Sequence, residues 1–106
     1  MTESQFLDAA DAMLAQIEST IEQSAAEAQC SLTAQVLTID FDDGTTMVVN
    51  AQTPMRQLWL ASRAGAMHFG YDGAAWRDLR SGEEFFDAVS RLVSQHVGRK
   101  LDLHPR

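Results

Sequence analysis

The sequence predicts an α+β fold, a two-layer α/β sandwich in which helices at both ends pack on one face of an antiparallel sheet. Three observations support it. Apolar residues repeat at helical spacing near both ends of the chain, short alternating runs fill the middle, and Asp-Gly turns separate several of these runs. The order is helix, five or six strands, helix. A chain of 106 residues is expected to form one domain over residues 1–106.

The first segment is predicted to be a helix from Thr2 to Ala26. Thr2 and Gln5 have the spacing of a capping box, in which each side chain accepts from the other residue's backbone N–H. Apolar residues follow at the helical period, and these are Phe6, Ala10, Met13, Leu14, Ile17 and Ile21. This stripe is expected to face the sheet.

A hairpin is predicted in the middle of the chain. A short opening strand over residues 30–34 precedes the alternating run 36–41, and the run 45–50 returns after the turn 42–44. A three-residue loop with a bulge at Gly44 would turn Met47 and Val49 inward. A two-residue loop would invert that register, because side chains alternate between the faces of a strand.

Three further strands are expected, over residues 57–61, over residues 66–71 and around Trp76. In the first of them Leu58 and Leu60 share one face and are assigned to the core. Trp59 is therefore predicted to point to the opposite face. Trp76 is interpreted as a packing residue.

The closing helix is predicted to begin at a second capping box, Ser81 to Glu84. Gly98 is the candidate C-cap. The buried face is expected to carry Phe85, Val89, Leu92, Val93 and His96. The alternation of Leu101 and Leu103 predicts a tail that lies extended across the helices.

The net charge of −7 is unevenly distributed. Residues 1–55 contain nine acids and no Lys or Arg, so this half carries −9, whereas residues 56–106 carry +2. Such a chain repels nucleic acid and attracts cations or a basic partner. No run of apolar residues is long enough to span a membrane, so no membrane partner is expected. The N-terminus lacks a basic targeting region, and the lone Cys30 excludes an internal disulfide, which together predict a cytoplasmic protein.

The first helix carries acids on one outward face, and these are Asp8, Asp11, Glu18 and Glu22. A stripe of carboxylates without bases is either a solvated face or a ridge for metal ions or for a basic protein surface. Asp40, Asp42 and Asp43 add carboxylates near the hairpin. Asp42 and Asp43 fit ordinary turn chemistry.

Trp59 is either a single exposed aromatic or an interface anchor, since tryptophan is enriched at binding hot spots. Catalytic motifs are absent. His68, His96 and His104 have no ligand spacing and are interpreted as structural or merely exposed, and Cys30 as a small apolar residue.

The sequence resembles bacterial frataxins of the CyaY type. The resemblance covers essentially the whole chain, and its most specific parts are the segment Asn50, Gln52, Pro54 that continues into Gln57-Leu58-Trp59-Leu60-Ala61, and Ser81-Gly82-Glu83 ahead of Phe85. It implies the frataxin sandwich and a role in iron–sulfur cluster assembly. The implied partners are a cysteine desulfurase and the cluster scaffold protein.

The resemblance also implies site residues. Iron, Fe²⁺ or Fe³⁺, would be held weakly by the acids of the helix and the adjoining strand edge, namely Asp8, Asp11, Glu18, Glu22, Glu27, Asp40 and Asp42. Partner contacts would use Glu18, Glu22, Asn50, Gln57 and Trp59. Family ridges are usually denser, and here Ser19 and Gln23 are among the residues that interrupt the acids.

Three functional hypotheses follow. The first is an iron-binding accessory protein that regulates cluster assembly without catalysis of its own. The second is a ferroxidase that oxidises and stores iron. This second hypothesis is less favoured, because diiron sites use Glu-x-x-His pairs inside a helical bundle. The third is a structural adaptor that binds no iron. A monomer is expected, and oligomers driven by iron are left open.

Overall fold

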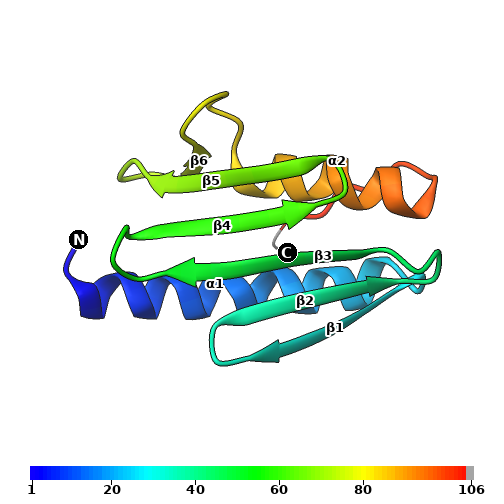
Figure 1. Cartoon of the computed structure of the whole chain (residues 1–106), viewed down its shortest axis with the longest axis horizontal. Helices are drawn as coiled ribbons and strands as arrows, with labels where there is room; N and C mark the ends of the chain where they lie inside the picture. Colours follow the sequence, from blue (N-terminus) through cyan, green and yellow to red (C-terminus); the bar gives the residue numbers. More distant parts are fainter. Residues whose placement is uncertain (105–106) are drawn as a thin grey trace.

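The structure, a computed structural model, describes residues 1–104 and contains two helices and six strands. The elements are α1 (Glu3–Ser24), β1 (Ala28–Thr33), β2 (Val36–Phe41), β3 (Thr46–Gln52), β4 (Gln57–Ser62), β5 (Gly65–Tyr71), β6 (Trp76–Asp78) and α2 (Phe85–Val97). The strands form one antiparallel sheet in sequence order. Both helices lie on the same face of it (Figure 1). The predicted two-layer α/β sandwich is confirmed.

The capping box at the start of α1 is formed as predicted. The Gln5 N–H donates to Thr2 Oγ1 at 3.1 Å, and the Thr2 N–H donates to Gln5 Oε1 at 2.9 Å. The apolar stripe is buried except for Met13, which is partly buried. The helix ends at Ser24, two residues before the predicted end, because Ala25 already has an extended backbone.

The hairpin of β2 and β3 has the register of the three-residue loop. Met47 pairs with Ile39 and Val49 with Leu37, and all four side chains are fully buried. Gly44 has a φ of 86°, in the left-handed region that glycine adopts without strain. The predicted inward orientation of Met47 and Val49 is therefore confirmed.

The first strand begins earlier than predicted. Strand β1 starts at Ala28, which pairs with Phe41, so the ladder with β2 uses the whole length of that strand. The turn between them consists of Ala34 and Gln35, with φ of 50° and 66°. Both residues are in the conformation that two-residue hairpin turns require.

The predicted start of the second helix is wrong by one turn. The N-cap of α2 is Glu84, whose carboxylate accepts from the N–H groups of Phe86 at 2.9 Å and Asp87 at 3.3 Å. Ser81 instead donates its hydroxyl to Asp78 Oδ2 at 2.9 Å. The spacing of Ser81 and Glu84 matched a capping box, but the carboxylate of Asp78 already engages the serine.

The core lies between the sheet and the two helices. Phe6 of α1 meets Trp76 of β6 edge-on with ring centroids 5.9 Å apart, which confirms Trp76 as a packing residue. Helix α2 ends at Val97, and Gly98 with a φ of 77° is its C-cap, as predicted. The tail then runs along α2, where the Leu103 N–H donates to Ser90 Oγ at 2.8 Å and the Leu103 side chain is fully buried.

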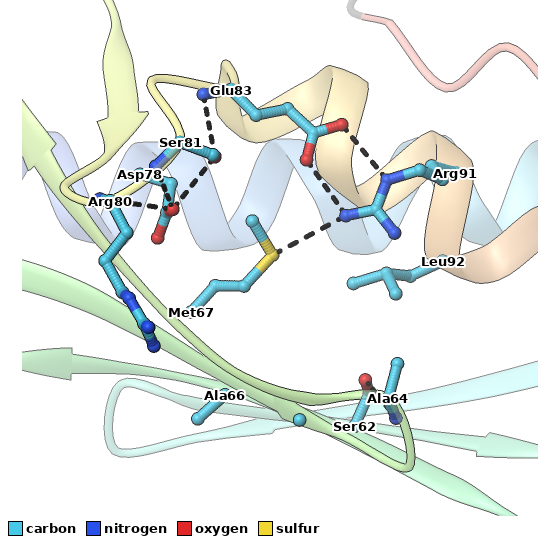
Figure 2. A pocket seen from close by; sticks show the side chains of 11 residues that line it. Ser62, Ala64, Ala66, Met67, Asp78, Arg80, Ser81, Glu83, Arg91 and Leu92 are labelled. Carbon is cyan, nitrogen blue, oxygen red and sulfur yellow. Dashed lines mark hydrogen bonds and ion pairs between the residues drawn. The ribbon is translucent and has the colours of Figure 1, made fainter.

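One part of the sheet edge is uncovered. Strand β6 pairs with Phe69, Gly70 and Tyr71, so it covers only the second half of β5. The chain then leaves the sheet towards α2. A groove of about 290 Å³ remains between the first half of β5, the loop after β6 and α2 (Figure 2).

Candidate metal and partner surfaces

The outward face of α1 carries the predicted acids. Asp8, Asp11 and Glu22 are exposed and Glu18 is half-buried. Within residues 1–104 none of these four carboxylates forms an ion pair with a basic side chain. The repulsion between them is thus left uncompensated, and an added cation would reduce it.

The structure divides the predicted iron ligands into two groups. A helix of 22 residues is about 33 Å long, so the two ends of α1 lie far apart. The turn after β2 lies at the C-terminal end of α1, where the Asp42 N–H donates to the Glu27 carbonyl at 2.9 Å (Figure 1). Asp8 belongs to the opposite end. The acids near Asp42 therefore form one candidate site, and Asp8 with Asp11 forms another.

The thiol of Cys30 reports on the field of the first group. Burial, followed by the negative charges of Glu22, Glu18 and Asp40, raises its pKa to about 12. These three carboxylates thus act on the same point of the molecule. Cys30 stays a neutral thiol at physiological pH, which fits its interpretation as a small apolar residue.

Glu27 differs from the other predicted ligands because its carboxylate is already paired with a basic side chain. Arg99 donates to both oxygens, each at 3.0 Å, and also bonds the Ser24 carbonyl at 3.3 Å. The hydrogen bond from Arg99 is the main reason that the pKa of Glu27 lies below its usual value. An ion at Glu27 would have to displace this arginine.

The free acids fit a weakly held, hydrated cation. Carboxylate oxygens are hard donors that suit hard cations. Within the described chain, however, three ligating atoms come within 4.8 Å of one another only at Glu84, Asp87 and His104, and none of the α1 acids belongs to that group. The ridge offers one or two protein oxygens at a time, and water would complete the coordination.

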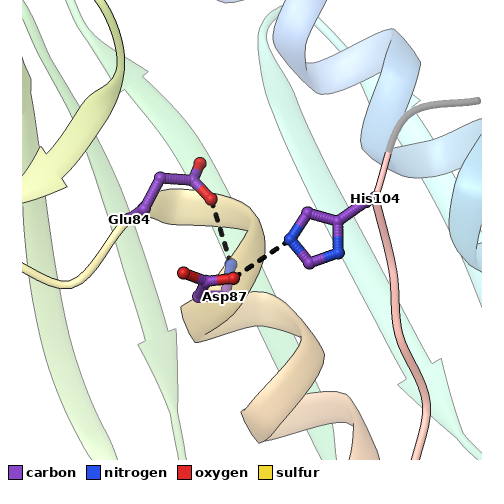
Figure 3. A group of neighbouring side chains, drawn as sticks. All are labelled: Glu84, Asp87 and His104. Carbon is purple, nitrogen blue, oxygen red and sulfur yellow. Dashed lines mark hydrogen bonds and ion pairs between the residues drawn. The ribbon is translucent and has the colours of Figure 1, made fainter.

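The cluster at the start of α2 was not predicted from the sequence (Figure 3). Its members already have partners: Glu84 accepts from the backbone N–H groups of Phe86 and Asp87, and the Asp87 Oδ1 lies 3.0 Å from the His104 Nε2. The other ring nitrogen of His104 contacts Asp102. The positive end of the helix dipole also disfavours a cation here. We assign this cluster to anchoring the tail. The three residues meet only because the C-terminal tail packs beside the start of α2, and their spacing along the sequence does not indicate this contact.

Trp59 lies on the face of the sheet opposite the helices, as predicted, because its neighbours Leu58 and Leu60 are buried in the core on the other face. Its indole is half-buried and stacks on the ring of His68, with centroids 4.4 Å apart and an interplanar angle of 17°. The indole Nε1 donates to Gln57 Oε1 at 2.7 Å. Asn50 pairs with Trp59 across the ladder. The predicted partner residues Asn50, Gln57 and Trp59 are thereby brought together.

Two residues of this face were missed. His68 was interpreted as structural or merely exposed, yet it forms the aromatic stack, and only the pairing of β4 with β5 places it opposite Trp59. Leu79 is 60% exposed and packs close to Gly70, where a Cβ would come within 3.0 Å of Leu79 Cδ2. An exposed leucine on the same sheet face as a stacked indole is typical of a protein-contact surface.

Residues 1–104 contain no helix that is both long enough and apolar enough to cross a membrane.

These features define a class of protein, an α/β sandwich with an acidic first helix and an open sheet face that carries an aromatic pair. The chain matches the family model of the frataxin-like domain over residues 1–99, and it belongs to the frataxin family. It is similar to the iron–sulfur cluster assembly protein CyaY of Ralstonia nicotianae, with 48% identity over 99 residues that cover 90% of this chain and 88% of the relative. The CyaY of Paraburkholderia phymatum is 36% identical and is matched over 99% of this chain and 100% of its own length.

Solved structures agree with this family. The frataxin of Psychromonas ingrahamii superposes with a TM-score of 0.91 at 32% identity, covering 98% of this chain and 99% of the other. A trimeric frataxin from the yeast Saccharomyces cerevisiae, complexed with ferrous iron, gives a TM-score of 0.70 at 27% identity, covering 93% and 88%.

Proposed function

We propose that this chain is an iron-binding accessory protein of iron–sulfur cluster assembly that regulates a complex of a cysteine desulfurase and a scaffold protein. The observation that carries the proposal is the row of carboxylates on α1 that form no ion pair with any of residues 1–104, in a chain whose relatives are named for cluster assembly. The protein would act in the cytoplasm as a monomer and catalyse no reaction of its own.

Iron, in this proposal, binds at the C-terminal end of α1. Glu18 and Glu22 are one helical turn apart, Asp42 lies in the turn after β2 at the same end of α1, and Asp40 lies in β2 with its side chain on the face opposite the buried Ile39 and Phe41. Fe²⁺ or Fe³⁺ would gain oxygen ligands and relieve repulsion at the same time. The binding is weak because few protein ligands converge and the ion keeps much of its water.

The acidic ridge also suits a basic surface on the desulfurase. Exposed charges of this kind steer association and make its rate depend on salt. The face around Trp59 would complete the contact with the desulfurase–scaffold assembly, because an indole buries about 150–250 Å² in an interface. Iron and partner would thus share Glu18 and Glu22, which links the two activities.

A ferroxidase is less well supported. Such a centre requires carboxylates and histidines that converge inside a protein core. The acids of α1 point outwards instead, and the histidine nearest to carboxylates, His104, already contacts Asp87 and Asp102.

The iron site is tested by adding Fe²⁺ without oxygen to ¹⁵N-labelled protein. Paramagnetic broadening should begin at the amides of Glu18, Glu22 and Asp40, and appear at Asp8 and Asp11 only at higher iron. Glu18→Gln with Glu22→Gln should weaken the first effect, whereas Asp8→Asn with Asp11→Asn is the charge-matched control. Broadening centred on His68 or His104 would refute the assignment.

The partner surfaces are tested by association kinetics with the desulfurase and with its complex with the scaffold. Glu18→Lys with Glu22→Lys should slow association and flatten its salt dependence. The matched reversal of Asp8 and Asp11 should do so less. Trp59→Ala should leave the salt slope unchanged and speed dissociation from the full assembly. Equal effects of the two charge reversals would contradict a localised ridge site.

A further inference from the structure

The groove beside β5 contains an unused backbone pairing position. In an antiparallel ladder, successive residues direct their N–H and C=O groups to opposite sides. The His68 carbonyl accepts from the Leu79 N–H at 2.9 Å, and the His68 N–H donates to Asp78 Oδ1 at 3.2 Å, so His68 faces away from β4. Ala66, two residues earlier, faces the same way.

Ala66 lies on the wall of the groove and is exposed. Its N–H and C=O point into the space that β6 would occupy if it continued beyond Asp78. Within the described chain no other segment pairs with them. One residue of an added strand could therefore exchange two backbone hydrogen bonds with Ala66, as in other cases of strand addition at a sheet edge.

The groove is also chemically distinct from the rest of the acidic surface. Met67 and Leu92 supply apolar wall, and the guanidinium of Arg91 is held by both oxygens of Glu83 at 2.9 and 3.1 Å. Arg80 extends from the loop towards the strand (Figure 2). Among residues 1–104 no carboxylate forms an ion pair with its guanidinium.

The two carboxylates of the groove are satisfied. The buried Asp78 accepts from the N–H groups of His68, Arg80 and Ser81 and from the Ser81 hydroxyl. Glu83 is bound to Arg91. Arg80 thus carries the free charge of this site, and its complement is a carboxylate.

We infer that the groove between β5 and α2 binds an extended segment of a partner protein, which adds as a strand at Ala66 and presents a Glu or Asp side chain to Arg80. The added strand lies antiparallel to β5, as the exchange of two hydrogen bonds with Ala66 requires, and its alternate side chains face Met67 and Leu92. This surface is separate from the α1 acids and the Trp59 face, so the inference does not depend on the proposed function.

The test uses the peptide acetyl-Thr-Val-Glu-Val-Thr-amide and ¹⁵N-labelled protein. Chemical shifts should change at Gly65, Ala66 and Met67, and the Ala66 amide should become protected from hydrogen exchange. Arg80→Gln should weaken binding of the peptide about two- to fivefold, the range for one exposed charge pair. Lys100→Gln, which removes the same charge at an exposed position outside the groove, should leave binding unchanged.

Two further measurements separate a strand from loose charge attraction. Replacing the peptide glutamate by glutamine should weaken binding to the wild type but not to Arg80→Gln, because the paired groups are then no longer both present. Unprotected Ala66 with shifts confined to Arg80 would overturn the inference, as would the absence of shifts at millimolar peptide. Sedimentation that shows the free protein to dimerise through this edge would also overturn the inference, because a second copy of the chain would then occupy the groove.

Discussion

Two tryptophans of one sheet have opposite environments. Trp76 is 3% exposed and packs edge-on against Phe6 in the core. Trp59 is half-buried, on the face that the helices leave open, and its main contact is the ring of His68. The same residue type therefore contributes to stability at one position and is available for contact at the other.

Trp59→Ala should lower the free energy of unfolding by about 1–2 kcal/mol, since it loses one aromatic stack and part of an exposed surface. Trp76→Ala should cost about 3–5 kcal/mol, the range for truncating a buried aromatic residue. Urea unfolding of both variants measures the difference. A loss at Trp59 as large as that at Trp76 would contradict the placement of the indole.

His104 links the tail to α2 through charge. The hydrogen bond with Asp102, and then that with Asp87, raise the pKa of this imidazole above its usual value, although partial burial opposes them. A raised pKa in the folded state means that the protonated form stabilises the fold. This contribution is fully present below the unfolded pKa of about 6.5 and is lost as the pH rises through the folded pKa.

Urea unfolding between about pH 5.5 and pH 8 should therefore show that rising pH costs the wild type more stability than it costs His104→Gln. Burial lowers the pKa of His96, so that residue contributes with the opposite sign, equally in both proteins. The control is His68→Gln, which changes a histidine that stacks on Trp59 and forms no ion pair in the described part of the chain. That variant should keep the wild-type slope. An unchanged slope in His104→Gln would mean that the tail contact does not titrate.

At the scale of elements, the capping residues determine where each helix begins, and the turns determine the register in which the strands pair. Thr2 caps α1 through the motif visible in the sequence, whereas α2 is capped by Glu84 because Asp78 engages Ser81. The turn between β1 and β2 is the least favourable of these features. Ala34 and Gln35 both have positive φ, although neither is a residue that adopts this region readily.

Ala34→Asn with Gln35→Gly should raise the free energy of unfolding by about 1 kcal/mol, because Asn-Gly is the preferred sequence of such a turn. The melting temperature should rise by about 4–8 °C. Gly44→Ala is the control of opposite sign, since its φ is 86° and nothing lies within 4 Å of the added methyl group. Thermal unfolding measures both variants. A lower melting temperature for the Asn-Gly variant than for the wild type would contradict this account.

At the scale of the whole molecule, the two halves of the chain partly neutralise each other. Arg99 pairs with Glu27 at 3.0 Å and Arg63 with Asp43 at 3.4 Å, each joining a base of the second half to an acid of the first. The α1 acids receive no such partner among residues 1–104. Their repulsion disfavours the compact state and is screened by salt.

The melting temperature should therefore rise between about 10 and 150 mM NaCl, over which the Debye length falls from about 30 to 8 Å. Divalent cations should act at lower concentration because they also bind carboxylates. Glu18→Gln with Glu22→Gln should raise the melting temperature at low salt and flatten its dependence on salt. A melting temperature that is flat for the wild type would show that the repulsion is negligible.

The sequence by itself determined the features that depend on near neighbours in the chain. Periodicity predicted both helices, and the alternation of Leu58, Trp59 and Leu60 predicted which face each side chain takes, because these patterns follow from backbone geometry. The loop ending in Gly44 indicated two registers, and the structure has the one with the bulge.

Only the tertiary structure decided which distant residues meet. It separated Asp8 from Asp42 by the length of α1, engaged Glu27 with Arg99 and stacked His68 on Trp59. It also left the outer side of Ala66, the side away from β4, without a pairing strand among residues 1–104, and it brought His104 to Asp87. These contacts form because strand pairing and the packing of the tail bring distant parts of the chain together. The contacting residues are as much as 17 or 72 positions apart, and no local sequence pattern links residues at such separations.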